Sequence, residues 1–117
     1  MGFAFKDLQV YQKALDFSVA IIDVIEDMET PRKHYRLIEQ LEASCTSVAL
    51  NISEGKGRFS KKEFRHFLYI ARRSLYETIT MLQIFLRKCW LKKAAYTKFY
   101  SRAEEINKML SGLIKSL

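Results

Sequence analysis

The sequence predicts an all-α protein, an antiparallel up-down-up-down four-helix bundle. Four stretches carry apolar residues at the three- and four-residue steps of an amphipathic helix. The segments between them are short, so consecutive helices are expected to pack antiparallel. One proline and four glycines in 117 residues leave little turn material for an all-β fold. We therefore expect one domain over 1–117, with helices at about 7–29, 31–55, 60–90 and 94–116.

The first helix is predicted from a single apolar stripe that runs from Leu8 to Met28. Asp7 stands immediately before this stripe and is a candidate N-cap, because its carboxylate can accept from the first unpaired backbone N–H groups. A helix of about six turns is expected.

The second helix combines an apolar face with a strip of small polar residues. Thr30 and Pro31 read as an N-cap followed by proline at the first helical position. The polar strip consists of Gln40, Ser44, Ser47, Asn51 and Glu54. Its two serines are short enough for another helix to approach closely. Gly55 and Gly57 are expected to end the helix, since either can adopt the left-handed conformation.

The third helix begins at a predicted capping box. In Ser60-Lys61-Lys62-Glu63, the serine oxygen accepts from an early helical N–H, and Glu63 reaches back to the serine N–H. Several apolar or aromatic residues of this helix fall outside its core stripe. They predict a homo-oligomer interface. The candidate interface residues are Ile70, Tyr76, Met81 and Ile84.

The fourth helix follows a connection at Lys92-Lys93 that no glycine or proline marks. Gly112 lies near its end and costs up to about 1 kcal/mol relative to alanine. Cys45 and Cys89 both fall within helical patterns and belong to no C-x-x-C motif. We expect two buried, reduced thiols, with neither a disulfide nor a metal site.

Hydropathy and the N-terminal residues predict a cytoplasmic protein with no membrane partner. Apolar residues make up 49% of the chain and charged residues 28%, as in a globular protein. No apolar run approaches the roughly 18 residues of a transmembrane helix. The first residues carry neither a secretory signal nor a myristoylation motif.

The net charge of +7 is unevenly distributed along the chain. Residues 1–30 carry two basic and six acidic side chains, whereas residues 31–117 carry eighteen basic and seven acidic ones. A first cluster, 56–73, has seven basic residues and one acid, and a second, 87–102, has six basic residues and none. This density of one sign favours an anionic partner, nucleic acid before membrane. A solvated basic surface is the alternative.

The first basic cluster supplies a candidate nucleic-acid-binding surface. Its members are Lys56, Arg58, Lys61, Lys62, Arg65, Arg72 and Arg73. Lys and Arg neutralise phosphates, and the interleaved Tyr69 and Tyr76 can stack on unpaired bases or pack in an oligomer. No signature predicts sequence-specific reading of a duplex.

Four polar residues near the same turn predict an internal network. Asn51, Glu54, Ser74 and Glu77 are expected to set the register of the second and third helices, with Arg58 folding back towards Glu54. A ligand or nucleic-acid site is the alternative interpretation of the same residues.

The sequence offers no catalytic residues. His34 and His66 are isolated, with no second ligand at metal-binding spacing. No nucleophile-elbow, P-loop or dinucleotide motif occurs. We expect a non-enzymatic protein with no cofactor, no metal and no identified small-molecule substrate.

The chain resembles the family of 23S rRNA-intervening-sequence proteins. The resemblance rests on FKDLQVYQKALDF, YRLIEQLEASCTSVALNISEGKGR, FRHFLYIARRSLYET and MLSGLIKSL, and it extends nearly from end to end. Arg73 departs from the family, whose members commonly have glycine there. The resemblance implies a four-helix bundle that assembles as a ring-like homo-oligomer, a pentamer. It implies no catalytic activity.

The functional hypothesis from the sequence is an oligomeric bundle that binds rRNA or another nucleic acid through its basic face. The alternative is a scaffold that docks an acidic protein, without a physiological nucleic-acid role.

Overall fold

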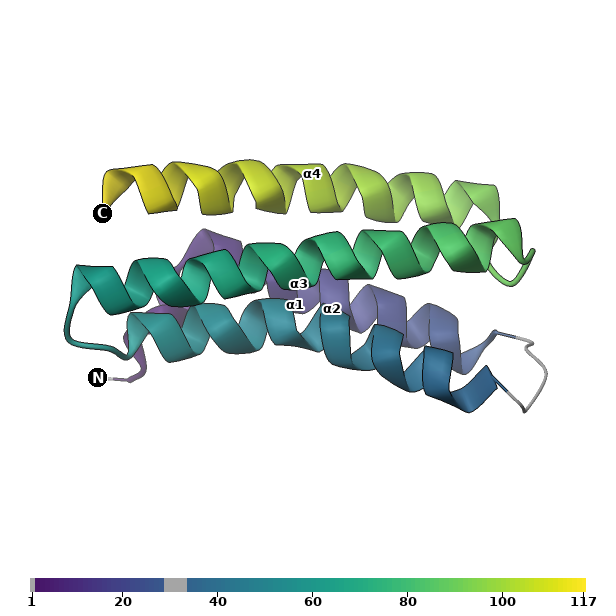
Figure 1. Ribbon diagram of the computed structural model, residues 1–117, viewed down its shortest axis with the longest axis horizontal. Helices are drawn as coiled ribbons and strands as arrows, with labels where there is room; N and C mark the ends of the chain where they lie inside the picture. The colour runs from purple at the N-terminus through teal and green to yellow at the C-terminus, as the bar shows by residue number, and fades with distance from the viewer. Residues whose placement is uncertain (1, 29–33) are drawn as a thin grey trace.

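The computed structural model describes residues 2–28 and 34–117, and every regular element in that part of the chain is helical. A 3₁₀ turn, η1 (Ala4–Asp7), precedes four α-helices. These are α1 (Gln9–Glu26), α2 (Tyr35–Lys56), α3 (Lys61–Arg87) and α4 (Lys93–Ser116). Figure 1 shows that the chain reverses direction at each connection, so the predicted up-down-up-down bundle is confirmed. The predicted cap at Thr30-Pro31 lies outside the described residues.

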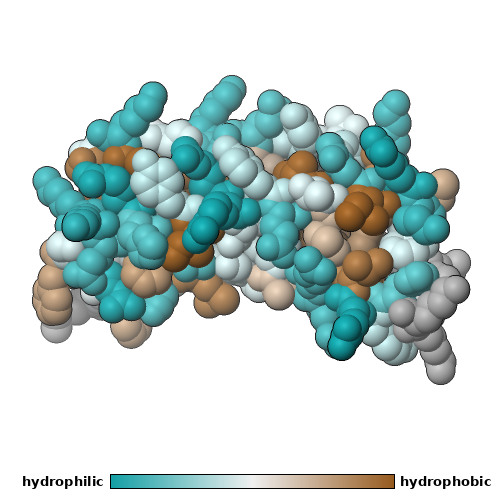
Figure 2. All heavy atoms as spheres, in the orientation of Figure 1, coloured by the Kyte–Doolittle hydropathy of each residue, from teal (hydrophilic) through white to brown (hydrophobic). Residues whose placement is uncertain are grey.

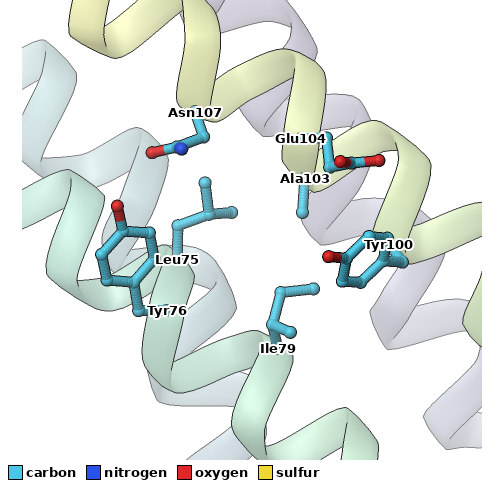
Figure 3. Close-up of a pocket in the computed structure, with 7 residues that line it drawn as sticks. All are labelled: Leu75, Tyr76, Ile79, Tyr100, Ala103, Glu104 and Asn107. Carbon is cyan, nitrogen blue, oxygen red and sulfur yellow. The ribbon is translucent and has the colours of Figure 1, made fainter.

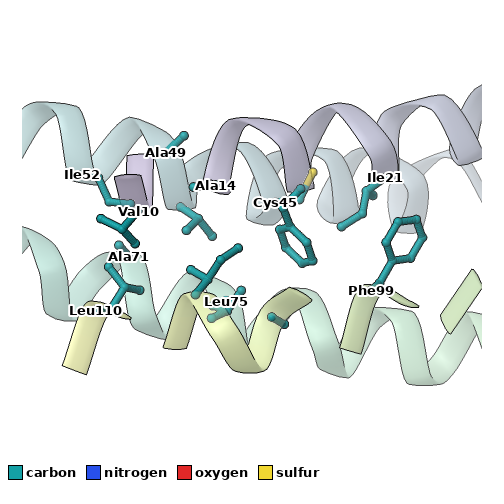
Figure 4. Close-up of a cluster of buried hydrophobic side chains, with 14 of the residues drawn as sticks. Val10, Ala14, Ile21, Cys45, Ala49, Ile52, Ala71, Leu75, Phe99 and Leu110 are labelled. Atoms are coloured by element: carbon teal, nitrogen blue, oxygen red, sulfur yellow. The ribbon is translucent and has the colours of Figure 1, made fainter. Parts of the chain in front are cut away.

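The hydrophobic core runs along the whole 45 Å length of the bundle and draws on all four helices. Figure 4 shows Ala14 and Ile21 of α1 facing Leu75 of α3 and Phe99 of α4 across this core. The most extensive helix pair is α2 with α3. α3 also packs against α4, which makes it the central element of the candidate site.

The start of α1 differs from the predicted cap at Asp7. Asp7 belongs to η1, and Leu8 occupies the N-cap position without a side-chain hydrogen bond. Gln12 secures the turn from inside the helix, because its Nε2 donates to the Lys6 carbonyl over 2.9 Å. The cap prediction was therefore wrong.

The corner between α2 and α3 is tight, and its two glycines act differently from expectation. Gly55 is buried within α2, and Gly57 has a φ of −76°, so neither adopts the left-handed conformation. A Cβ at Gly55 would lie 2.7 Å from Phe67 Cβ and 2.9 Å from Phe64 Cδ1. Gly55 is therefore the point of closest approach between α2 and α3.

Ser60 caps α3 as predicted, accepting a 3.1 Å hydrogen bond from the Glu63 backbone N–H. The Glu63 carboxylate, however, accepts a 3.2 Å hydrogen bond from the Ser60 hydroxyl. The sequence had predicted that the Ser60 backbone N–H would be the donor.

The end of α3 is a Schellman motif closed by a cysteine. Cys89 has a φ of 63°, and its N–H donates to the Leu86 carbonyl over 3.0 Å. The Trp90 N–H donates to the Phe85 carbonyl over 2.9 Å, and the two rings pack edge to face. Cys89 is consequently exposed, whereas Cys45 is buried. The prediction of two buried thiols was wrong for Cys89.

None of the helices that the structure describes is long and apolar enough to cross a membrane.

Candidate nucleic-acid interface

The first basic cluster lies at the end of the bundle where α2 turns into α3 and where α4 finishes (Figure 1). Its seven members differ in what holds them. Two are held at the corner by aromatic rings of α3, two reach towards α4, and three extend from exposed positions of α3.

Lys56 and Arg58 are positioned by the aromatic residues of the first turns of α3. The Lys56 ammonium lies 5.6 Å from the centre of the Phe64 ring, and the Arg58 guanidinium lies 4.9 Å from that of Phe67. Arg58 also pairs with Glu54 over 3.5 Å. These contacts keep both cations at the corner while leaving them exposed to solvent.

Lys61, Lys62 and Arg73 are exposed on α3. The two lysines occupy the first turn of the helix, where the unpaired N–H groups already create positive potential. A cation there costs a few tenths of a kcal/mol in stability, which a bound anion would offset.

Arg65 and Arg72 are half-buried and turned towards α4. Arg65 Nη2 donates to the Leu117 carbonyl over 2.6 Å, and Arg72 Nη1 donates to Ser111 Oγ over 3.2 Å. Arg72 also lies over the Tyr69 ring, 5.0 Å from its centre. Both arginines therefore tie the end of α4 to α3, a role that the sequence did not predict.

Sequence reasoning missed Phe59, which is fully exposed at the tip of the corner. It stands between Arg58 and the capping residue Ser60. Its two neighbours in the chain, Arg58 and Ser60, line an open hollow of about 600 Å³. The hollow is lined by Arg58, Ser60, Lys62, Glu63, His66 and Phe67. No signal in the sequence indicates this exposure, because an apolar residue at the position before the N-cap normally packs onto the helix that follows.

The predicted polar network exists in part and joins α2 to α3. Asn51 Nδ2 donates to Ser47 Oγ over 2.9 Å, and Ser47 Oγ lies 2.8 Å from Ser74 Oγ. Ser74 donates to the Ile70 carbonyl over 3.1 Å, which leaves Ser47 as the donor to Ser74.

One turn away, Thr78 Oγ1 donates to Ser44 Oγ over 3.0 Å, and both residues are buried. Thr78 and Ser44 extend the network along the α2–α3 contact. Glu54 and Glu77, by contrast, are exposed and take no part in these hydrogen bonds among the described residues. The structure thus brings Asn51 and Ser74 together through Ser47, and it places the two carboxylates outside.

The four candidate interface residues do not form one patch. Met81 is only 4% exposed and belongs to the core, because α3 packs against both α2 and α4 and buries a wider arc than one stripe. Its assignment to an interface was wrong. Ile84 and Tyr76 are exposed and Ile70 is half-buried.

Tyr76 lines an apolar groove between α3 and α4 with a volume of about 270 Å³. Figure 3 shows Tyr76 and Tyr100 on opposite helices flanking this groove, with Ile79 and Ala103 between them. Asn107 also lines it, and its Oδ1 is buried without a hydrogen-bond partner in the described part of the chain.

Among the residues described, no three His, Cys, Asp or Glu side chains lie close enough together to hold a metal ion. His66 lines the hollow at the corner, and His34 packs on Trp90 with ring centres 4.6 Å apart. Burial raises the pKa of the Cys45 thiol to about 11, with the nearby Glu42 carboxylate adding to the shift. Cys45 is therefore a neutral core residue.

Comparisons with known proteins agree with this architecture. The model of the family described as 23S rRNA-intervening sequence protein matches residues 6–112. A crystal structure of a protein with unknown function from the S23 ribosomal protein family of Bacteroides thetaiotaomicron is similar, with a TM-score of 0.83 and 29% sequence identity. The match covers 91% of this chain and 98% of that chain. No curated protein matches.

Proposed function

The chain belongs to the 23S rRNA-intervening sequence protein family, and we propose that it is a non-enzymatic, homo-oligomeric protein that binds RNA through its α2–α3 corner. The proposed corner surface consists of Lys56, Arg58, Lys61 and Lys62, extended along α3 by Arg73. We place the action of the protein in the cytoplasm as part of the same proposal.

The observation that carries this proposal is the excess of exposed basic side chains at the corner. Lys61 and Lys62 are exposed in the first turn of α3 and add to its positive end. Residues 54–63 carry four basic side chains against the two acids Glu54 and Glu63, of which Glu54 pairs with Arg58. The corner therefore presents excess positive charge to a phosphate backbone.

We propose that the oligomer is a ring, and a pentamer by family resemblance. A ring uses head-to-tail contacts, so each subunit needs two different surfaces. Two such surfaces lie on either side of the exposed face of α3, because Tyr76 and Ile84 are about 80° apart around the helix axis. The first surface is the groove of Tyr76, Tyr100 and Asn107. The second is the flank of α3 that carries the exposed Ile84, with the half-buried Ile70 about four turns earlier on the same side.

Such a ring would have to be built from small apolar patches. In the view of Figure 2, hydrophilic side chains cover most of the face, and the hydrophobic patches among them are small and separate. A donor from a neighbouring copy would also satisfy Asn107 Oδ1.

The test of RNA binding is a titration of a fluorescent RNA hairpin at 50 and 200 mM KCl. If three or four phosphates are neutralised, the affinity is expected to fall about 20- to 150-fold between these salt concentrations. A Lys61→Glu/Lys62→Glu variant should weaken binding strongly and reduce the salt dependence. Arg65 is left unchanged, because it also holds the end of α4.

The matched control is Lys98→Glu/Lys108→Glu, which changes the net charge equally on exposed positions of α4. It should weaken binding much less than the corner variant. An equal loss in both variants would show a diffuse charge effect, and no binding at 50 mM KCl would refute the proposal.

The second candidate function is a scaffold that docks an acidic protein on the same cations. The arginine–aromatic pair at Arg58 and Phe67 suits a carboxylate as well as a phosphate. If the wild-type protein did not bind the RNA hairpin but bound a poly-glutamate peptide at 50 mM KCl, the scaffold function would be favoured.

A further inference from the structure

We propose that the corner prefers RNA with unpaired nucleotides and that Phe59 is the residue on which an unpaired base stacks. This inference rests on the proposed RNA-binding function and assigns it a class of ligand. It follows from the exposure of Phe59, from the chemistry of the hollow beside it and from the charges around both.

Phe59 is exposed although a local partner is available. It occupies the position before the N-cap Ser60, from which an apolar side chain normally packs onto the fourth residue of the helix. That fourth residue is Phe64, an aromatic ring that would make a good contact. Phe59 instead projects wholly into solvent, and Phe64 packs against Gly55 with Lys56 above its ring. A bound partner would cover the ring that the fold leaves bare.

The surroundings of Phe59 determine the chemistry of that partner. Lys56, Arg58, Lys61 and Lys62 lie within three residues of Phe59, so the partner is anionic. A flat aromatic ring among cations suits a nucleotide, because the base stacks on the ring while its phosphates meet the lysines.

The hollow next to Phe59 favours a nucleotide over an anionic membrane. Its volume of about 600 Å³ lies within the usual range for small-molecule sites. It is lined by Ser60, Glu63 and His66, whose side chains can donate hydrogen bonds to a base edge or accept them from it. A membrane surface would bury Phe59 in its acyl region and would leave the hydrogen-bonding groups of Ser60, Glu63 and His66 in this hollow without partners.

A paired base is not available for this contact. In a duplex each base is stacked between its neighbours and its face is covered, whereas loops and bulges present bases that can be splayed out. The corner is therefore expected to distinguish unpaired from paired RNA through Phe59, while its lysines bind both.

The test compares two fluorescent RNAs with equal numbers of phosphates, a hairpin with a wide unpaired loop and a fully paired duplex. Phe59→Ala should lower affinity for the looped RNA about 5- to 150-fold, the range measured for one stacked base. Its affinity for the duplex should change less than twofold. Phe59→Tyr should retain binding to the loop, and Phe59→Leu should lose it, since leucine is apolar but offers no ring.

A direct readout is available because the chain has a single tryptophan, Trp90. Trp90 lies in the α3–α4 connection at the opposite end of the bundle from Phe59 (Figure 1). In Phe59→Trp, stacking on a base should quench the added fluorescence when the looped RNA is titrated in. The wild-type protein, with Trp90 alone, should show little change.

The possible failures are distinguishable. Unchanged binding of Phe59→Ala to the looped RNA, with wild-type binding intact, would overturn this inference and leave RNA binding by the lysines standing. If the wild type bound neither RNA at 50 mM KCl, both proposals would fail. If Phe59→Ala lost binding to phosphatidylserine vesicles, Phe59→Leu kept it and neither variant lost RNA affinity, the ring would be a membrane anchor and the inference would be wrong. An unchanged thermal midpoint in Phe59→Ala is expected throughout, because the ring makes no packing contribution.

Discussion

Ser74 has a hydroxyl that joins two helices, and its role differs from that of the carboxylates near it. It accepts from Ser47 of α2 and donates to the Ile70 carbonyl of its own helix. Glu54 lies on the surface, 52% exposed at its side chain, and its ion pair within the described part of the chain is with Arg58, four residues later. Hydrogen bonds that are half-buried stabilise more than exposed ion pairs, which solvent and salt screen.

We therefore expect Ser74→Ala to lower the free energy of unfolding by about 1 kcal/mol, because the Ser47 hydroxyl loses its hydrogen-bond acceptor on α3. Glu54→Gln should change it by less than about 0.5 kcal/mol. Urea denaturation followed by circular dichroism measures both. A larger effect for Glu54→Gln than for Ser74→Ala would show that the carboxylate belongs to the network.

The two cysteines are expected to react at very different rates. Cys89 is exposed in the α3–α4 connection, whereas Cys45 is fully buried with its thiol near the Glu42 carbonyl. A disulfide reagent at pH 8 should therefore label one thiol per chain rapidly, and the second only as the protein unfolds. Cys89→Ala should abolish the rapid phase. Rapid labelling that persists in this variant would contradict the burial of Cys45.

Cys45 also predicts a loss of stability at high pH. Burial raises its pKa to about 11, above the value near 9 expected in the unfolded chain. The neutral thiol is the form that the folded state favours, so this contribution is complete below about pH 9 and is lost as the pH rises towards 11. Cys45→Ala should weaken the decline in unfolding free energy over this window. An identical decline in the variant would assign it to other groups.

Helix packing in this protein depends on one close approach, between α2 and α3 at Gly55. We expect Gly55→Ala to lower the free energy of unfolding by about 1–3 kcal/mol, because the added Cβ would meet Phe67 Cβ at 2.7 Å and force the helices apart. The higher helix propensity of alanine, worth up to about 1 kcal/mol, does not offset this overlap.

Gly112→Ala is the matched control for Gly55→Ala. Gly112 lies in α4, and a Cβ there would meet nothing within 4 Å. This variant should therefore gain up to about 1 kcal/mol from helix propensity alone. Thermal denaturation of the pair should move the midpoints in opposite directions, and a stabilising Gly55→Ala would show that the helices separate at little cost.

The helices themselves could be predicted from the sequence because apolar spacing reports which side of a helix is buried. Two kinds of feature could not. Met81 is buried because α3 packs between two neighbours, and spacing along one helix does not show how many neighbours it has. The end of α3 relies on Cys89 in a left-handed conformation, where glycine would be expected, so no residue type marks it.

For the molecule as a whole, the sequence predicted the basic cluster, whereas the surroundings of its members came only from the structure. The density of basic residues marked the corner, since charge is visible in sequence. Arg65 and Arg72 bind α4, and sequence reasoning could not show this because their partners lie 52 and 39 positions away in the chain, respectively. Phe59 was missed because an apolar residue in a turn is ordinarily assumed to pack inward, and only the structure shows it bare.

The wild-type protein is expected to assemble as a head-to-tail ring. Wild-type protein should sediment as a multiple of the 13.8 kDa chain, five times that mass for a pentamer. Tyr76→Glu alters the α3–α4 groove and Ile84→Glu alters the other surface, so each should dissociate a head-to-tail ring. Tyr35→Glu, at an exposed position of α2, is the control and should leave the assembly intact.

Mixing the two variants tests the geometry of the contact. A Tyr76→Glu subunit retains the surface formed by Ile70 and Ile84, and an Ile84→Glu subunit retains the groove. One intact junction can therefore form between them, and an equimolar mixture should sediment as a dimer when each variant alone is a monomer. Two monomeric variants that stay monomeric when mixed would argue for a two-fold contact, in which both residues are needed on both sides. A wild-type species of 13.8 kDa at tens of micromolar would refute the ring altogether.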